Sequence, residues 1–177
     1  LPLDDIAALN KTLRGVRDSK QMSARQRENL VETIKEAALT WGIADVSAAQ
    51  IDEMGIVPAT ALAMRLAYEA AMQKVDFTPD ALFLDDMVLY DIRDVHQISM
   101  IEGDSRSLSI AAASVLAKTW RDSHMRELDA QYPDYGFGAH KGYGTADHRA
   151  ALKQHGPSPV HRMYYRPIAD LNKDDEA

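Results

Sequence analysis

The most constraining feature of this sequence is a helical pattern that runs from Ser107 to about Gln131. Its first turns hold the small-residue run Ile110-Ala111-Ala112-Ala113-Ser114-Val115, and small side chains there imply close packing against a sheet. Two strand candidates precede it, an apolar run at residues 81–86 and a more polar segment at residues 96–101. Strands and helices in mixed order around one core predict an α/β domain with helices packed on a central sheet.

Two capping boxes, each a Ser followed three residues later by Gln, mark helix starts in the first third of the chain. The first, at Ser23, predicts a helix over residues 23–39, and the second, at Ser47, predicts a small helix. Residues 41–46 between them read as a short strand. The segment 58–72 begins with Pro58 and has apolar residues on most faces, which predicts a largely buried helix.

The last third of the chain is predicted to be a helical and loop region. Residues 132–145 carry four glycines and Pro133, which indicates a structured loop, and a short helix over residues 146–154 should end at Gly156. Residues 169–177 are polar and acidic, as in disordered tails. At the other end, Leu1-Pro2-Leu3 resembles the frayed end of a strand. We expect one domain over residues 1–168, followed by the tail.

Composition limits the function classes. The 177 residues contain no cysteine, so a metal site would need oxygen or imidazole ligands. The sequence has no run of about 18 apolar residues and no leader pattern, so we expect a soluble chain with no membrane partner. The lack of cysteine fits a cytoplasmic setting, and we expect a monomer. The net charge of -7 argues against nucleic-acid binding by bulk charge alone.

The charge is unevenly distributed along the chain. Residues 105–168 hold nine Lys and Arg against five Asp and Glu, and the rest of the chain holds eleven against 22. The same stretch contains five of the six histidines and seven of the twelve aromatic residues. Basic groups interleaved with aromatic rings suit a sugar-phosphate surface, although a tyrosine-rich loop packed on its own helix has the same composition.

Two carboxylates follow the predicted strands. Asp85 stands where the apolar strand ends, a position that holds a side chain rigidly yet exposes it to solvent, while Asp104 stands where the second strand leads into the long helix. Structural alternatives exist for both, a turn at Asp85-Asp86 and a helix N-cap at Asp104. Two such acids stay ionised most readily around a divalent cation, so together they suggest a Mg²⁺ or Mn²⁺ site.

Phosphodiester hydrolysis commonly uses two metal ions, and two aspartates are few ligands for that task. Either Glu102 or Asp86 joins them, or further ligands lie outside these 177 residues.

Four motifs in order make the chain similar to type 2 ribonuclease H (ribonuclease HII), over residues 18–167. These motifs are Asp18-Ser19-Lys20, the run from Gly103 to Ser114, Tyr135-Gly136-Phe137 with His140 to Thr145, and Gly156-Pro157-Ser158-Pro159 with His161-Arg162.

The resemblance implies a ribonuclease H-like mixed sheet flanked by helices, and hydrolysis of the RNA strand of RNA/DNA hybrids by metal-activated water. Its partners would be such hybrids and ribonucleotide-containing duplex DNA, and its products would carry 5′-phosphate and 3′-hydroxyl ends. In the family four acids line the site, and two of them match Asp85 and Asp104. The family's first strand, which carries an Asp-Glu pair and a Gly-Arg-Gly element that senses 2′-hydroxyls, has no match here. We therefore expect a truncated chain with little or no activity.

The resemblance also implies substrate contacts. Tyr143 matches a tyrosine that stacks on the sugar where RNA gives way to DNA, against the alternative of a hydroxyl that anchors its loop. Lys20, Lys141 and Arg162 would contact phosphates, against the alternative of solvated surface cations. Asp86 stands where the family usually has Gly.

Three histidines, His140, His155 and His161, are expected to be hydrogen-bonded structural residues. The main functional alternative to the nuclease is a non-catalytic module that binds hybrid, and a third is a small-molecule phosphohydrolase, which would need a closed pocket.

Overall fold

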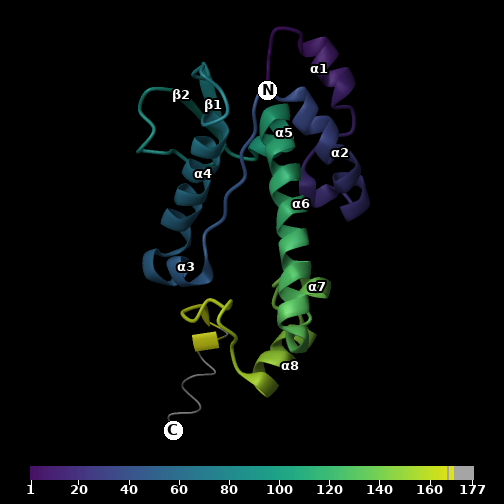
Figure 1. Cartoon of the computed structure of the whole chain (residues 1–177), viewed down its shortest axis with the longest axis vertical. Helices are drawn as coiled ribbons and strands as arrows, with labels where there is room; N and C mark the ends of the chain where they lie inside the picture. The colour runs from purple at the N-terminus through teal and green to yellow at the C-terminus, as the bar shows by residue number, and fades with distance from the viewer. Residues whose placement is uncertain (167, 170–177) are drawn as a thin grey trace. The chain divides into compact units, whose positions relative to one another are not determined.

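The computed structural model describes residues 1–166, 168 and 169. Figure 1 shows the helices and strands in chain order. The α-helices are α1 Ile6–Thr12, α2 Ala24–Ala37, α3 Ala48–Met54, α4 Ile56–Met72, α5 Gly103–Arg106, α6 Leu108–Gln131, α7 Phe137–His140 and α8 Ala146–His155. The 3-10 helices are η1 Ser19–Gln21 and η2 Pro133–Tyr135, and the strands are β1 Ala81–Asp85 and β2 His96–Met100.

The chain divides into two compact units. Unit 1 comprises Leu1–Asp45 and Ala61–Thr119, and unit 2 comprises Val46–Thr60 and Trp120–Ala177. Each unit is described by itself below. The expectation of one domain over residues 1–168 stays a prediction, and residues 170–177 of the expected tail lie outside the described residues.

Both predicted capping boxes are present. The Ser23 hydroxyl accepts from the Gln26 N–H, and the Gln26 side chain accepts in return from the Ser23 N–H at 2.9 Å. Ser47 and Gln50 make the same reciprocal pair at the start of α3. These bonds satisfy amide groups that have no partner inside a helix, which is why both helices begin where the sequence predicted.

Helix α1 was not predicted, and residues 1–3, expected to be the frayed end of a strand, belong to no strand. Asp5 caps the helix by accepting from the Ala8 N–H at 2.9 Å. Leu9 and Leu13 are both buried in the core. An Asp followed by apolar residues four and eight positions later is a helix-start signal that the sequence contained.

The sheet among the described residues consists of β1 and β2, which pair in parallel with Ala81 opposite His96 and Asp85 opposite Met100. Both strands lie where they were predicted. The predicted strand at residues 41–46 is wrong, because this extended segment runs along α4 instead of joining the ladder. The Thr40 hydroxyl donates to the Ala71 carbonyl at 2.8 Å, and the Lys74 ammonium donates to the Trp41 carbonyl at 2.8 Å. The larger mixed sheet implied by the resemblance is therefore reduced, within the described residues, to two parallel strands.

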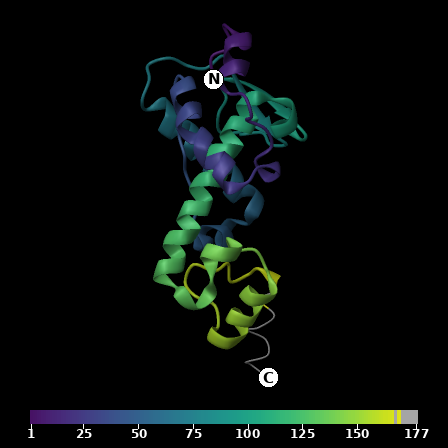
Figure 2. The same cartoon turned by 90° about the vertical axis from the view of Figure 1, so that its right-hand side faces the viewer.

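The N-terminal half of α6 packs in the core of unit 1 (Figures 1 and 2). Its small-residue run was expected to face a sheet, but its buried residues cluster with residues of α1 and α2 and with Met22, which follows η1. The hydroxyls of Ser114 and Ser19 lie 2.7 Å apart, a close approach that larger side chains would prevent. This core comprises Leu9, Leu13, Met22, Ile34, Ala112, Val115 and Leu116.

A second cluster in unit 1 holds the sheet against α4. It contains Leu84, Leu89, Ile92 and Val95, with Ala61, Met64 and Tyr68 of α4 packed against it. Helix α4 starts two residues before the predicted boundary and is less buried than predicted, because Ala59 is its one fully buried residue. Its remaining apolar side chains are mostly half-buried, since one side of the helix meets the sheet and its loops.

Unit 2 builds its core from the C-terminal half of α6, the glycine-rich segment and α8. Its buried cluster comprises Met125, Tyr135, Phe137, Leu152 and Ile168. The segment predicted as a structured loop contains η2 and α7, which share Gly136 at φ +68. Helix α8 ends at Gly156, as predicted, where φ is +70. No helix among the described residues has the length and apolar content needed to cross a membrane.

Candidate active site

Asp85 is the last residue of β1, and its side chain turns toward the start of α5. Its Oδ1 accepts a hydrogen bond from the Gly103 N–H at 2.8 Å. Gly103 leaves room for this contact, because a Cβ at this position would lie 3.3 Å from Asp85 Oδ1 and would displace the end of the Ile110 side chain. The bond ties the end of the strand to the residue that precedes Asp104.

Asp104 lies in the first turn of α5 and is only 9% exposed. The N-cap of α5 is Glu102, which has left-handed backbone angles, so Asp104 is not the N-cap that the structural alternative required. Its Oδ2 lies 3.6 Å from the Lys20 ammonium, whose side chain is 79% exposed. The buried Asp104 carboxylate therefore faces an exposed cation across this distance.

Lys20 is presented by η1, which is held firmly. Asp18 caps this turn by accepting from the Lys20 N–H at 2.9 Å. The buried Arg27 guanidinium donates to the carbonyls of Ser19 and Met22, which flank the turn on either side of Lys20. The sequence analysis missed this role of Arg27, and nothing in the α2 pattern pointed to it.

A hollow of about 320 Å³ opens beside Asp104, between η1 and the starts of α5 and α6. Its lining includes Arg17, Asp18, Asp104 and Arg106, so both signs of charge face it. The mixture suits a site that receives an anionic group and a cation together.

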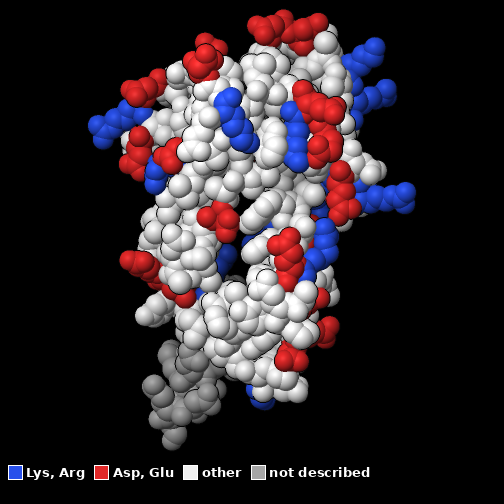
Figure 3. Space-filling view, in the orientation of Figure 1, with Lys and Arg blue, Asp and Glu red and all other residues white. Residues whose placement is uncertain are grey.

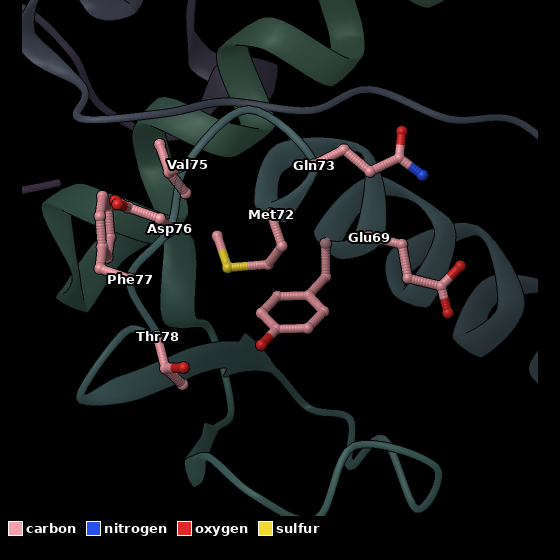
Figure 4. Close-up of a pocket in the computed structure, with 8 residues that line it drawn as sticks. Glu69, Met72, Gln73, Val75, Asp76, Phe77 and Thr78 are labelled. Atoms are coloured by element: carbon pink, nitrogen blue, oxygen red, sulfur yellow. The ribbon is translucent and has the colours of Figure 1, made fainter.

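A separate cavity of about 550 Å³ lies between the end of α4 and the loop before β1, and Figure 4 shows its lining side chains. Two acids, Glu69 and Asp76, line it together with Met72 and Phe77. Glu69 is already paired with Arg65 at 2.5 Å. None of the predicted site residues lines this cavity, so it is not the site predicted from the sequence.

Asp86 has a positive φ of 47, and its N–H donates to the Met100 carbonyl at 3.1 Å. This left-handed position favours Gly, and Asp is among the few other residues that adopt it readily. The geometry therefore explains how Asp can stand where the family usually has Gly.

Among the residues that the structure describes, no group of three or more His, Asp or Glu side chains is arranged to hold a metal ion. Asp85 and Asp104 both offer hard oxygen ligands, which suit Mg²⁺ or Mn²⁺. The bond from Gly103 uses only one of several acceptor positions on the Asp85 carboxylate. Two carboxylates fit a cation whose remaining ligands are water and substrate phosphate.

The other predicted contact residues belong to unit 2. Tyr143 is 63% exposed. Lys141 has a left-handed backbone at the end of α7, and its ammonium donates to the Gly138 carbonyl. This contact differs from both readings weighed for Lys141, a phosphate contact and a solvated surface cation, because the ammonium is directed at its own loop. Arg162 is half-buried, and its carbonyl accepts from the Tyr165 N–H at 3.2 Å.

The histidines of unit 2 make more hydrogen bonds, including one to each other, than the sequence suggested. His140 and His161 are hydrogen-bonded, as expected, to the Tyr135 carbonyl and to Ser158. His148, which the sequence analysis did not single out, bonds to both His161 and the Tyr143 carbonyl. His148 lies three residues beyond the motif that ends at Thr145, and only this nearness could have drawn attention to it.

The surface charge does not form one basic face in the view of Figure 3, where Lys and Arg side chains are interspersed with Asp and Glu. An Asp-Glu dipeptide does occur at Asp52-Glu53, on helix α3. The Asp52 carboxylate there accepts from the backbone N–H groups of Met163 and Tyr164, at 2.6 and 3.2 Å. It is a structural anchor on a helix and not the first-strand pair of the family.

Comparison with known proteins identifies the family. The model of the family described as Ribonuclease HII matches residues 3–167. The ribonuclease HII of Shouchella clausii is 48% identical over 158 residues, which cover 89% of this chain and 59% of that protein. The ribonuclease HII of Desulforamulus reducens is 43% identical over 166 residues, which cover 93% of this chain and 81% of that protein. The chain thus spans under two thirds of the length of the first relative.

The fold is also that of a solved relative. The crystal structure of ribonuclease H2 from Pyrococcus horikoshii OT3 matches with a TM-score of 0.75 over 99% of this chain and 88% of that chain, at 20% identity. The described residues therefore have a ribonuclease H2-like fold, and the sequence match extends over nearly their whole length. The chain belongs to the ribonuclease HII family.

Proposed function

We propose that this chain carries part of a metal-dependent endonuclease that hydrolyses the RNA strand of RNA/DNA hybrids, including ribonucleotides embedded in DNA, and leaves 5′-phosphate and 3′-hydroxyl ends. One observation carries the proposal. The Asp85 carboxylate accepts a hydrogen bond from the N–H of Gly103, the residue that precedes the buried Asp104. The Asp104 carboxylate in turn faces the exposed ammonium of Lys20.

Asp85 and Asp104 would hold Mg²⁺ or Mn²⁺. When bound, the cation would activate water and neutralise charge that develops on the phosphate. Lys20 has a second role, because it pairs with Asp104 and is exposed enough to turn toward a phosphate. Its firmly held backbone sets the region that the ammonium can reach.

In unit 2, Tyr143 would stack on the sugar at the junction of RNA and DNA, and Arg162 and Lys141 would contact phosphates. The exposure of the Tyr143 ring supports this role. Lys141 would first have to release the Gly138 carbonyl, so we expect its contribution to be the smallest of the three.

Cleavage by these 177 residues alone should be very slow. The family uses four acids and the motifs here supply two, so part of the transition-state charge would go unneutralised. The experiment is an assay of the purified chain on a labelled hybrid with Mg²⁺ or Mn²⁺. We expect trace release of fragments, reduced by about 100-fold or more in Asp85→Asn and Asp104→Asn. Release at ordinary enzyme rates would refute the proposal of low activity.

Metal binding can be tested without turnover. Paramagnetic Mn²⁺ added to the ¹⁵N-labelled chain should broaden the Gly103 amide signal first, and Asp104→Asn should weaken the effect. Glu36→Gln, which removes an exposed charge from α2, is the matched control and should leave the broadening unchanged. A chain that binds hybrid in a gel shift, yet shows neither this broadening nor any cleavage, would be the non-catalytic binding module instead.

A further inference from the structure

Three imidazoles in unit 2 form a connected group next to Tyr143. His148 Nε2 lies 3.1 Å from His161 Nε2, and His148 Nδ1 lies 3.0 Å from the Tyr143 carbonyl oxygen. The rings of His140 and His148 stack with centroids 4.2 Å apart. His148 and His161 are buried, at 5% and 7% exposed.

The backbone fixes which nitrogen of each ring carries the proton. The Ser158 N–H can only donate, and it donates to His161 Nδ1 at 3.0 Å, so neutral His161 carries its proton on Nε2. That proton points at His148 Nε2, which must accept it. His148 therefore carries its own proton on Nδ1 and donates it to the Tyr143 carbonyl.

The same reasoning applies to His140. The Gly142 N–H donates to His140 Nδ1 at 3.1 Å, so the His140 proton lies on Nε2 and is donated to the Tyr135 carbonyl at 2.7 Å. The Tyr143 N–H in turn donates to the His140 carbonyl at 2.9 Å. Both the N–H and the C=O of Tyr143 are thus held by histidine residues.

We propose that His148, with its tautomer set by His161, is a positioning residue that fixes the backbone of Tyr143 so that the exposed ring is presented in one orientation to a sugar of the nucleic-acid duplex. The inference rests on the proposed function of Tyr143. Holding an exposed aromatic ring before it binds lowers the entropy lost on binding. Two arginines also bind this segment: Arg149 donates to the Gly144 carbonyl, and Arg121 donates to the Lys141 carbonyl at 3.2 Å.

The tautomers give a test that needs no substrate. Long-range ¹H–¹⁵N spectra of the full chain at pH 7.5 should show His148 protonated on Nδ1, the less common form in solution, and His161 protonated on Nε2. Finding His148 protonated on Nε2 would break the chain of hydrogen bonds and overturn the proposal.

Two isosteric substitutions separate the two links of His148. In His148→Asn the side-chain amide replaces Nδ1 and keeps the bond to Tyr143, whereas in His148→Gln it replaces Nε2 and keeps only the bond to His161. Affinity for an RNA/DNA hybrid, measured by fluorescence anisotropy, should stay near that of the unsubstituted chain in His148→Asn and fall about five-fold in His148→Gln. Equal losses in both variants would overturn the positioning role. Thermal melts identify a variant that has simply unfolded, and His155→Gln is the exposed control.

Tyr143→Ala distinguishes failure of the inference from failure of the proposed function. If this substitution leaves affinity unchanged, Tyr143 is not a contact and the proposed function of this residue fails, together with the inference built on it. If it weakens binding while His148→Gln does not, only the positioning role fails. We expect Tyr143→Ala to weaken binding and to abolish the further effect of His148→Gln in the double variant.

Discussion

At the scale of single residues, Gly42 decides how the segment after α2 packs on α4. A Cβ there would overlap the Ala67 carbonyl oxygen and lie 2.7 Å from the Ala71 amide nitrogen. These are backbone atoms of helix α4, and they cannot shift without distorting the helix. We predict that Gly42→Ala lowers the free energy of unfolding by about 1–3 kcal/mol, measured by urea denaturation.

Gly144→Ala is the control for that prediction, because the nearest atom to its added Cβ is Arg149 Nη1, at 4.0 Å. It should change the free energy of unfolding by less than about 0.5 kcal/mol. A Gly42→Ala protein as stable as the Gly144→Ala protein would mean that residues 40–42 do not pack against α4 as described.

Single residues were also where the sequence was most and least informative. Asp85 and Asp104 stood out as a pair, because two carboxylates that follow neighbouring strands suit a divalent cation, and in the structure the first is hydrogen-bonded to the segment that carries the second. Arg27 and His148 did not stand out, because their roles depend on backbone carbonyls brought near them by the fold. A pattern of side chains carries no information about such partners.

At the scale of elements, local signals predicted local structure well. The capping boxes placed α2 and α3, and apolar runs placed β1 and β2, since these features act within a few residues. The strand predicted at residues 41–46 was wrong because an extended apolar segment has the same sequence pattern whether it pairs with a strand or lies along a helix. The segment lies along α4 because Gly42 allows the close approach.

Helix α8 is held in unit 2 through the hydrogen bonds of His148 to Tyr143 and His161, and the stability that they support should depend on pH. Burial lowers the pKa of His148 and of His161 below the ordinary value of 6.5. Between the lowered pKa and 6.5 the unfolded chain binds more protons than the folded chain, so acid favours unfolding. The stabilisation is complete above pH 6.5 and is lost as the pH falls below it, by at most about 1.4 kcal/mol per pH unit for each proton.

Urea denaturation between pH 7.5 and pH 5 measures this dependence. The slope of the unfolding free energy against pH should be shallower in His148→Asn, which removes one of the two protons, than in the unsubstituted chain. His155→Gln, an exposed substitution on the last turn of α8, serves as the matched control. An identical slope in all three proteins would show that the buried pair does not govern acid stability.

At the scale of the whole molecule, the resemblance predicted the family and its fold, but not the size of the sheet. A mixed sheet depends on pairing between distant strands, and the described residues contain β1 and β2 as its paired strands. The division into two units was not visible in the sequence either, because α4 and α6 each contribute residues to both and no linker composition marks the boundary.

The net charge of -7 leaves this chain with little general attraction for nucleic acid, so binding should rest on a few local contacts. Three cations are proposed to contact phosphates, namely Lys20, Lys141 and Arg162. If each neutralises one phosphate, the logarithm of the hybrid association constant should fall with the logarithm of salt concentration at a slope of about −3. Anisotropy titrations at several salt concentrations measure this slope.

Lys20→Met should make the salt slope shallower by about 1, because one released counterion is lost. The exposed Lys11→Met in α1 should not change it. A slope unaffected by Lys20→Met would remove Lys20 from the phosphate contacts and leave it only its pairing with Asp104.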